Sequence, residues 1–486
     1  MSYIEGRDRN QSVLFPPTLD EYIAESNPVR AVAAFLEALD FKAMKFERAR
    51  PAATGRPGYD PRKMMELYLW GHMNKVRSSR KLERECERNL EVMWLMEGLK
   101  PDFKTISDFR RDNGAGITQV VVRFRLWAVE VKLIEGKKVA IDGSKFKAVN
   151  SVNRNFTKNK LQAGIKREKA KAEKYLKEMD EVDKAEGLEE VERKISAEEL
   201  KEKIDGIGKY LERNQERLKE VEASGENQVS KTDADSRLMK TARGMDVCYN
   251  VQTVVDSKHK LIAEYEVTND GHDLHQLGNM AKKAKEALGV AELTVLADGG
   301  YYDAGRVKEC EEAGITVYVP IKEPGKAEKK GVFPLERFKY EEERDVYICP
   351  QGEDLTRRGQ ETLKGKLYDL YMSKACRKCP IRTLCTTAKT GSRKIRRWEH
   401  IEVVNRQAER NRSQPEVMKE RKGLVEHPYG TIKRGMDAGY FLLKGKQKVS
   451  IEMGITVLAY NMKRVINILG VEAMIKSMKM ATALAK

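Results

Sequence analysis

The chain has 486 residues, enough for about three domains of ordinary size. Hydrophobic residues make up 40% of it and charged residues 34%, so it can bury cores while exposing a heavily charged surface. The formal net charge is +17, and this excess suits a polyanionic partner, because neutralising phosphates releases counterions. A protein that is merely basic, or one held at an anionic membrane, is the alternative.

Several cellular settings are disfavoured by the sequence. The N-terminal MSYIEGRDRN is too charged for a secretory signal, and no apolar run reaches the roughly 18 residues needed to span a bilayer. Seven cysteines, odd in number and unevenly spread, do not fit a secreted disulfide scaffold. We therefore expect a reduced cytoplasmic setting without a membrane partner.

Residues 1–135 are predicted to form a helical domain. Apolar residues such as Met64, Leu82 and Leu90 recur at helical spacing. Basic residues stand at the ends of these helices: Arg77, Arg80, Lys81, Arg110 and Arg111. This pattern fits a DNA-binding helical domain and equally fits the solvated face of an ordinary helical bundle.

The central part of the chain alternates between strand and helix patterns. A strand is predicted in KKVAIDGSKFKAV, two more in DVCYNVQTVVD and HKLIAEYEVTND, and a strand buried on both faces in ELTVLADGG. Asp303 is expected to cap a short helix that ends at Gly314, before a last strand in ITVYVPI. The fold class is therefore α/β, a mixed sheet with helices. We assign this core to residues 136–157, 227–330 and 406–470, followed by a C-terminal tail at 471–486.

Two insertions interrupt this core. Residues 158–226 are charge-rich, and their apolar residues follow a 4-3 register in two runs, which predicts an antiparallel helical hairpin of coiled-coil type. Such a hairpin suits dimerisation, DNA contact or a purely structural role. Residues 331–405 form the second insertion. Between Arg357 and His400 it holds thirteen Lys or Arg against three acids, with Trp398 beside Arg396 and Arg397 as a stacking surface for DNA.

Two aspartates follow predicted strands, Asp142 in AIDG and Asp298 in LADG. Carboxylates on neighbouring strands can supply the oxygen ligands that Mg²⁺ prefers, and two such ions can activate phosphoryl transfer. Asp-Gly is also turn chemistry, so both residues equally fit a simple turn. Asp298 is the better candidate because its buried strand leads into a helix.

Four cysteines of the second insertion form another candidate site. Cys349, Cys376, Cys379 and Cys385 have the pattern C-x26-C-x2-C-x5-C, which can close a tetrahedral structural Zn²⁺ site. The first half of the pattern lacks a second cysteine, so free cysteines remain the alternative. The sequence has no P-loop, HExxH or GxSxG motif, which argues against an ATPase, a zincin or a serine hydrolase.

The motifs together resemble a known family, the insertion-sequence transposases of the DDE superfamily. The resemblance begins in GRPGYDPRKMMELYLWGHMNKVRSSRKLERECERNLEVMWLMEG and PDFKTISDFRRDN. It continues through VAIDGSKFKA, TDADSRLM, YNVQTVVD, LADGGYYD, RKGLVEHPYGTIKRGM, FLLKGKQKVSIE and LAYNMKR. It covers nearly the whole chain, in the family's order, and implies an RNase H-like catalytic core.

The resemblance implies three catalytic carboxylates, Asp142, Asp298 and Glu426, which would hold two Mg²⁺ or Mn²⁺ ions. It also implies that Lys433, seven residues after the glutamate, contacts a DNA phosphate, and that Lys422 or its neighbour Arg421 binds DNA. The family usually has an arginine four residues before the glutamate, where this chain has Lys422.

The third carboxylate has a competing candidate. Pro428 disfavours a continuous helix through Glu426, because proline removes a backbone donor and clashes one turn back. Glu426 is then expected at a helix end or a kink. Glu452, in KVSIEMG, is the competing candidate.

The function that this resemblance implies is metal-dependent cleavage of DNA at the ends of a transposon and strand transfer into target DNA. The partner would be double-stranded DNA, with a homodimer expected because two element ends are paired, in a cytoplasmic, nucleoid-associated setting. The alternatives are a non-catalytic DNA-binding protein derived from a transposase and a nuclease that does not join strands.

Overall fold

The computed structural model describes residue 14 and residues 17–47, 58–185, 197–321, 331–363, 365–387 and 391–481. The chain divides into two compact units. The first unit comprises Met1–Glu135, Asp142–His272 and Val425–Lys486, and the second comprises Gly136–Ile141 and Asp273–Leu424. The chain crosses from one unit to the other within strand β1 (Lys138–Lys147) and within helix α13 (Pro415–Gly430).

The N-terminal part of the first unit is helical, as the periodicity predicts. Its elements are η1 (Asp20–Tyr22), α1 (Pro28–Glu37), α2 (Pro61–Met73), α3 (Ser79–Arg88), α4 (Leu90–Leu95), α5 (Phe103–Asp112) and α6 (Gly114–Glu130). Asn27, Asp60 and Asp102 begin α1, α2 and α5, because the side chain of each accepts a hydrogen bond from a backbone N–H of the first turn. Helix α2 is buried over most of its length.

Glu66 is an acidic residue buried within α2. Its side chain is fully buried and pairs with Lys63, whose Nζ lies 3.2 Å from Oε2. Burial raises the pKa of Glu66 to about 7, although the charge of Lys63 acts in the opposite direction.

This raised pKa predicts a pH-dependent stability. Between the ordinary pKa of 4.5 and about 7, the folded chain keeps a proton that the unfolded chain has released. The free energy of unfolding should therefore fall as the pH rises through this window, by about 3 kcal/mol at most. Glu66→Gln should lose this part of the pH dependence in urea unfolding measured at pH 5 and pH 8. Equal pH dependence in both proteins would show that Glu66 is ionised in the fold.

The C-terminal helices complete the core of the first unit. Helix α14 (Lys446–Leu469) packs against α2, α6 and β6 (Ile262–Thr268), and its residues 452–462 are all buried. Residues 471–486, predicted as a tail, instead contain helix α15 (Val471–Met480), which packs against α1. Val471, Met474 and Met478 are spaced on one face of α15 and are buried, which explains why this segment is helical. Residues 482–486 lie outside the described residues.

The central strand of the first unit is β5 (Gly244–Asp256). Strand β5 lies between β4 (Arg237–Thr241) and β1 in the sheet order, and it also pairs with β6. The β4–β5 and β5–β6 pairs are antiparallel. Residues 247–256 of β5 are all buried, because they have neighbours on both faces and both edges.

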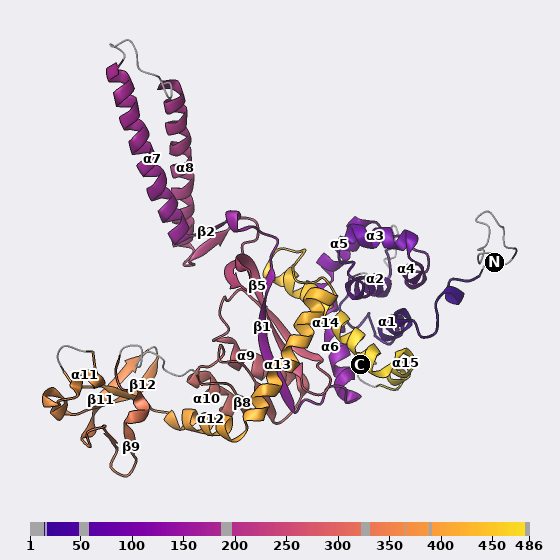
Figure 1. Ribbon diagram of the computed structural model, residues 1–486. Coiled ribbons are helices and arrows are strands. Elements are labelled where there is room, and N and C mark those ends of the chain that lie inside the picture. The colour runs from indigo at the N-terminus through magenta and orange to yellow at the C-terminus, as the bar shows by residue number, and fades with distance from the viewer. Residues whose placement is uncertain are drawn as a thin grey trace, which may run out of the picture. The chain divides into compact units, whose positions relative to one another are not determined.

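The first insertion forms the predicted helical hairpin. The short strands β2 (Asn155–Thr157) and β3 (Gln228–Ser230) pair antiparallel, and helices α7 (Lys158–Ala185) and α8 (Ala197–Ala223) extend from them side by side (Figure 1). Glu168 and Asn214 lie at core positions of the coiled-coil register and are buried. Lys171 donates a hydrogen bond to Glu168, and Asn214 donates one to the carbonyl of Tyr210.

The second unit contains a parallel sheet in the order β1-β7-β8, formed by Lys138–Ala140 of β1, β7 (Leu293–Leu296) and β8 (Ile315–Tyr318). Helices α9 (Gln276–Leu288), α10 (Ala304–Glu312) and α12 (Ile401–Ser413) pack beside these strands. Asp303 caps α10 by accepting a hydrogen bond from the backbone N–H of Arg306, as predicted. The strand and helix order across the two units is that of a mixed α/β fold with a helical N-terminal region.

The second insertion forms a small antiparallel sheet that its sequence pattern did not predict. Its strand order is β13-β12-β11-β10-β9, with β9 (Lys339–Glu341), β10 (Val346–Ile348), β11 (Asp354–Leu363), β12 (Lys366–Met372) and β13 (Ile395–Trp398) (Figure 1). The short helices η4 (Leu335–Arg337), η5 (Lys374–Lys378) and α11 (Arg382–Cys385) flank these strands in the chain. Among all described helices, none has both the length and the apolar character needed to cross a membrane.

Candidate active site

Asp142 is the fifth residue of β1 and is half-buried. The predicted strand end is wrong, and so is the alternative of a turn at Asp142-Gly143, because β1 continues to Lys147. The continuation is stabilised by the burial of Phe146 and by backbone hydrogen bonds from Lys147 to Gly439 and from Phe441 to Lys147. Asp142 is therefore held on a rigid strand rather than on a flexible turn.

Asp298 follows β7 by two residues, at the carboxyl end of a strand that lies between two parallel neighbours. It also begins a turn, in which its carbonyl accepts from Tyr301 N at 3.0 Å and its Oδ1 accepts from Gly300 N at 2.6 Å. Asp298-Gly299 therefore both follows a buried strand and forms a turn, as the two interpretations of the sequence predicted. Its side chain remains about half exposed.

Arg421 and Lys422, predicted to bind DNA, lie on α13. The Nη2 atom of Arg421 lies 3.5 Å from Oδ2 of Asp298, and only 15% of its side chain is exposed. Arg421 is thus an ionic partner of a candidate catalytic carboxylate. Lys422, the next residue, is exposed.

Glu426 is exposed on α13, near the end of this helix. Pro428 lies inside the helix, and after Gly430 the helix widens into a single π-helical turn, η6 (Thr431–Gly435). Helix α13 thus continues through Glu426 and Pro428, which the sequence did not predict, and the irregular turn begins only at Thr431. Single π-turns are often found at functional sites.

The segment after Glu426 is tied to β1 by side-chain hydrogen bonds. The hydroxyl of Tyr429 donates to the carbonyl of Asp142 at 2.8 Å. The Nζ of Lys433 donates to Ser144 Oγ at 2.6 Å and to the carbonyl of Lys145 at 2.8 Å, and it lies 4.6 Å from the ring centre of Phe146. Burial lowers the pKa of Lys433. Lys433 is thus engaged with β1, while its predicted contact with a DNA phosphate stays a prediction.

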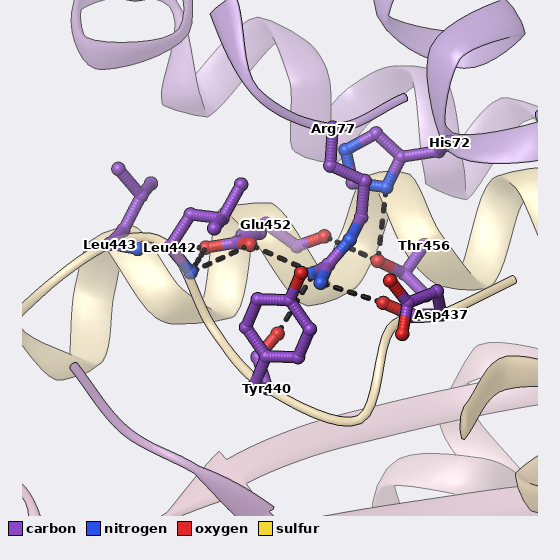
Figure 2. Close-up of polar contacts among 8 residues, drawn as sticks. All are labelled: His72, Arg77, Asp437, Tyr440, Leu442, Leu443, Glu452 and Thr456. Atoms are coloured by element: carbon purple, nitrogen blue, oxygen red, sulfur yellow. Dashed lines mark hydrogen bonds and ion pairs between the residues drawn. The ribbon is translucent and has the colours of Figure 1, made fainter. Parts of the chain in front are cut away.

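Glu452, the competing third carboxylate, lies in a buried polar cluster (Figure 2). Its carboxylate accepts from the backbone N–H groups of Leu442 and Leu443 at 3.0–3.1 Å and lies 3.3 Å from Nη1 of Arg77. Burial raises the pKa of Glu452, and the charges of Arg110 and Arg77 oppose this rise. The side chain of Glu452 is only 1% exposed, and its carboxylate is engaged by Arg77 and by two backbone N–H groups.

Trp398 does not offer the predicted stacking surface. Its side chain is buried, with Nζ of Lys366 lying 5.3 Å from its ring centre and the ring of His400 against its edge. It is the last residue of β13, a strand that was not predicted. Arg396 is exposed but paired with Glu361 at 2.8 Å, and the guanidinium of Arg397 lies 3.7 Å from the ring centre of Tyr340.

The four cysteines of the second insertion belong to the same small domain. Cys385 is part of its buried core, and Cys349 packs against this core. Gln351 N donates to Sγ of Cys349 at 3.4 Å in the turn that follows β10. Burial raises the pKa of the Cys385 thiol, and the neighbouring Cys379, Cys349 and Cys376 act in the same direction.

The residues that the structure describes include no group of three or more His, Cys, Asp or Glu side chains already arranged to hold a metal ion. The carboxylates Asp142, Asp298 and Glu426 nevertheless have the donor chemistry that Mg²⁺ requires, namely oxygen ligands that are not fully buried. Sequence reasoning missed the roles of Arg77, Tyr429 and Ser144. Tyr429 alone gave a signal, since it lies three residues after the candidate glutamate.

Two family models match the chain, and both describe transposases. Residues 17–112 match a transposase domain (DUF772), and residues 348–466 match a transposase DDE domain. The chain therefore carries two transposase domains. These two matches bear out the resemblance to insertion-sequence DDE transposases. The second match includes Glu426 and Lys433 but neither Asp142 nor Asp298.

Other comparisons add less. None of the curated proteins compared with the chain matches it significantly. A cryo-EM structure of the piggyBac transposase synaptic complex with hairpin DNA is similar over 93% of this chain and 78% of that chain, at 9% identity and a TM-score of 0.29.

Proposed function

We propose that this transposase cleaves DNA at the ends of a transposon and joins these ends to target DNA, through an RNase H-like core in which Asp142, Asp298 and Glu426 hold divalent metal ions. The observation that carries the proposal is the register of β1 and β7. These parallel strands place Ala140 beside Leu296. Asp142 follows Ala140 by two residues within β1, and Asp298 follows Leu296 by two residues, after the end of β7.

The third carboxylate is supported by a second observation. Glu426 precedes Tyr429 by three residues, and Tyr429 binds the backbone of Asp142. The helix that carries Glu426 is thereby anchored to the residue that carries the first carboxylate. Glu452, in contrast, is occupied by Arg77 and two backbone amides.

Two Mg²⁺ or Mn²⁺ ions, when bound, would activate the attacking oxygen and stabilise the leaving one. The chain's own groups would fix the geometry. Tyr429 and Lys433 hold β1 at Asp142, Ser144 and Lys145, and Arg421 holds the side chain of Asp298. Water would attack the phosphodiester at the transposon end, and the freed 3′-hydroxyl would then attack target DNA.

The test is an assay with labelled terminal-repeat DNA and a target plasmid. Cleaved ends and joined products should both appear with Mg²⁺ or Mn²⁺ and vanish on chelation. Cleavage without joined products would favour a nuclease. DNA binding that survives chelation, with no cleavage under any metal, would favour a non-catalytic DNA-binding protein. We expect a homodimer at the paired ends, in the nucleoid of the cytoplasm.

We also propose that Cys349, Cys376, Cys379 and Cys385 hold a structural Zn²⁺. The proposal is supported by their thiol donors and by the small core of their domain, in which the buried cluster has six residues: Phe338, Tyr347, Leu355, Tyr371, Cys385 and Ile395. A domain with so small a core gains stability from a metal.

The purified protein should contain about one zinc per chain, released by a thiol-modifying mercurial. Cys379→Ser should lose the zinc and lower the melting temperature. Cys310→Ala is the matched control, because Cys310 is a buried cysteine of α10, outside this domain. Metal-free protein whose melting temperature is unchanged by Cys379→Ser would disprove the zinc site.

A further inference from the structure

Arg77 is a buried arginine between α2 and α3, within the N-terminal transposase domain. Its guanidinium reaches a distant loop that follows η6 (Figure 2). Nη2 donates to the carbonyl of Asp437 and Nη1 to the carbonyl of Tyr440, both at 2.8 Å, and the guanidinium lies 4.5 Å from the ring centre of Tyr440.

Glu452 binds the same loop from the other side. It pairs with Arg77 and accepts from Leu442 and Leu443, so the loop is held at four residues by two side chains. Burying such a charged pair has a large desolvation penalty, and an apolar pair of similar size is often as stable. The fixed geometry of the loop is therefore a better explanation for this pair than stability.

The loop that Arg77 and Glu452 hold is hydrogen-bonded to β1, the strand that contains Asp142. Lys147 N donates to the carbonyl of Gly439 at 3.2 Å, and Phe441 N donates to the carbonyl of Lys147 at 2.8 Å. Together with the bonds of Tyr429 and Lys433 described above, the segment 429–441 contacts β1 at residues 142, 144, 145 and 147. Arg77 is the N-terminal residue that fixes the far end of this segment.

We propose that Arg77 is a positioning residue for catalysis, which couples the N-terminal transposase domain to strand β1 through the loop at residues 437–443. The inference rests on the proposed function, since it assumes that Asp142 is a metal ligand. The sequence grouped Arg77 with the basic residues at helix ends that could contact DNA, but its side chain is buried. Loss of the clamp should release one end of the segment that supports β1 and misplace the carboxylate of Asp142.

The test compares Arg77→Lys with the wild type in three measurements. Lysine keeps the charge but lacks the planar fork that reaches two carbonyls at once. We expect the cleavage rate to fall about a hundredfold, as a misplacement of about 1 Å can cause. The Mg²⁺ concentration for half-maximal cleavage should rise, whereas the affinity for terminal DNA without metal should stay within about twofold, since the residue does not touch DNA.

Two further variants keep the inference falsifiable. Arg88→Met is the matched control, because Arg88 lies in the same domain, is 61% exposed and pairs locally with Glu85; it should cleave like the wild type. If Arg77→Lys fails to fold, the double variant Arg77→Met, Glu452→Met removes both charges together. A folded double variant should still show the reduced cleavage rate and the raised Mg²⁺ requirement.

The outcomes distinguish the coupling by Arg77 from the proposed function. A wild-type protein without any metal-dependent cleavage would overturn the proposed function itself. Normal cleavage and a normal Mg²⁺ requirement in the folded Arg77 variants would overturn the coupling alone. A parallel loss of DNA affinity and cleavage, with an unchanged Mg²⁺ requirement, would also overturn it and place Arg77 in DNA binding.

Discussion

Replacing Asp142 or Asp298 by asparagine is expected to abolish metal-dependent DNA cleavage while leaving the fold and the DNA affinity intact. Asparagine has the same shape but lacks the charge that a divalent ion requires. Metal ions supply several kcal/mol of transition-state stabilisation, so a loss of about a thousandfold or more in rate is expected. In Asp298→Asn, the side-chain carbonyl can still accept the hydrogen bond of Gly300, which preserves the turn. The measurements are single-turnover cleavage of terminal-repeat DNA and gel-shift affinity without metal.

Asp303→Asn provides the control from the same loop. Asp303 caps α10 and pairs with Lys366, and we assign it no role in catalysis. Its replacement should lower stability slightly and leave cleavage unchanged, since asparagine is also a good helix cap. Full cleavage by Asp298→Asn would remove Asp298 from the active site and with it the proposed metal chemistry.

Glu426 and Glu452 are expected to respond in opposite ways to substitution. Glu426→Gln should cut the cleavage rate by about a thousandfold, because it removes a charge that a divalent ion requires, and it should change stability little, because the side chain is exposed. Glu452→Ala should lower the free energy of unfolding by about 3–5 kcal/mol, because it leaves Arg77 buried without its charged partner. Urea unfolding followed by circular dichroism measures the second effect.

These two substitutions decide the identity of the third carboxylate. A Glu426→Gln protein with wild-type cleavage, beside a stable Glu452→Ala protein without cleavage, would reverse the assignment. The buried position of Glu452 and its bonds to Leu442 and Leu443 make this reversal an unexpected outcome.

Local patterns in the sequence predicted the elements that depend on local forces. The helical N-terminal region, the α7–α8 hairpin and the Asp303 cap all follow from periodicity and capping chemistry, and the structure contains them. The expectation that a strand ends at Asp142 was wrong, because Asp142-Gly143 looks like a turn when the partners that continue the strand are not known. Those partners lie near residues 439–441, about 300 residues away in the chain.

The errors in the second insertion have a similar cause. Apolar and polar residues alternate only weakly along strand β11, where Leu355 is the one buried residue among mostly polar and charged neighbours. The sequence pattern therefore did not clearly indicate a strand there. Trp398 looked like a stacking residue because its neighbours are basic, but it is buried at the end of β13. The role of Arg77 could not be foreseen either, since burial of a single arginine depends on Glu452, which follows it by 375 residues.

The small β2–β3 ladder at the base of the helical hairpin has a consequence for how this protein can diversify. Asn155 pairs with Ser230 and Thr157 with Gln228, so the helical hairpin begins and ends at neighbouring points of the first unit. An insert with adjacent ends is a module: its length can change at little entropic cost to the body that carries it. Related transposases can therefore gain, exchange or shorten this helical hairpin without changing the strand that carries Asp142. A reporter domain can be inserted at the same place.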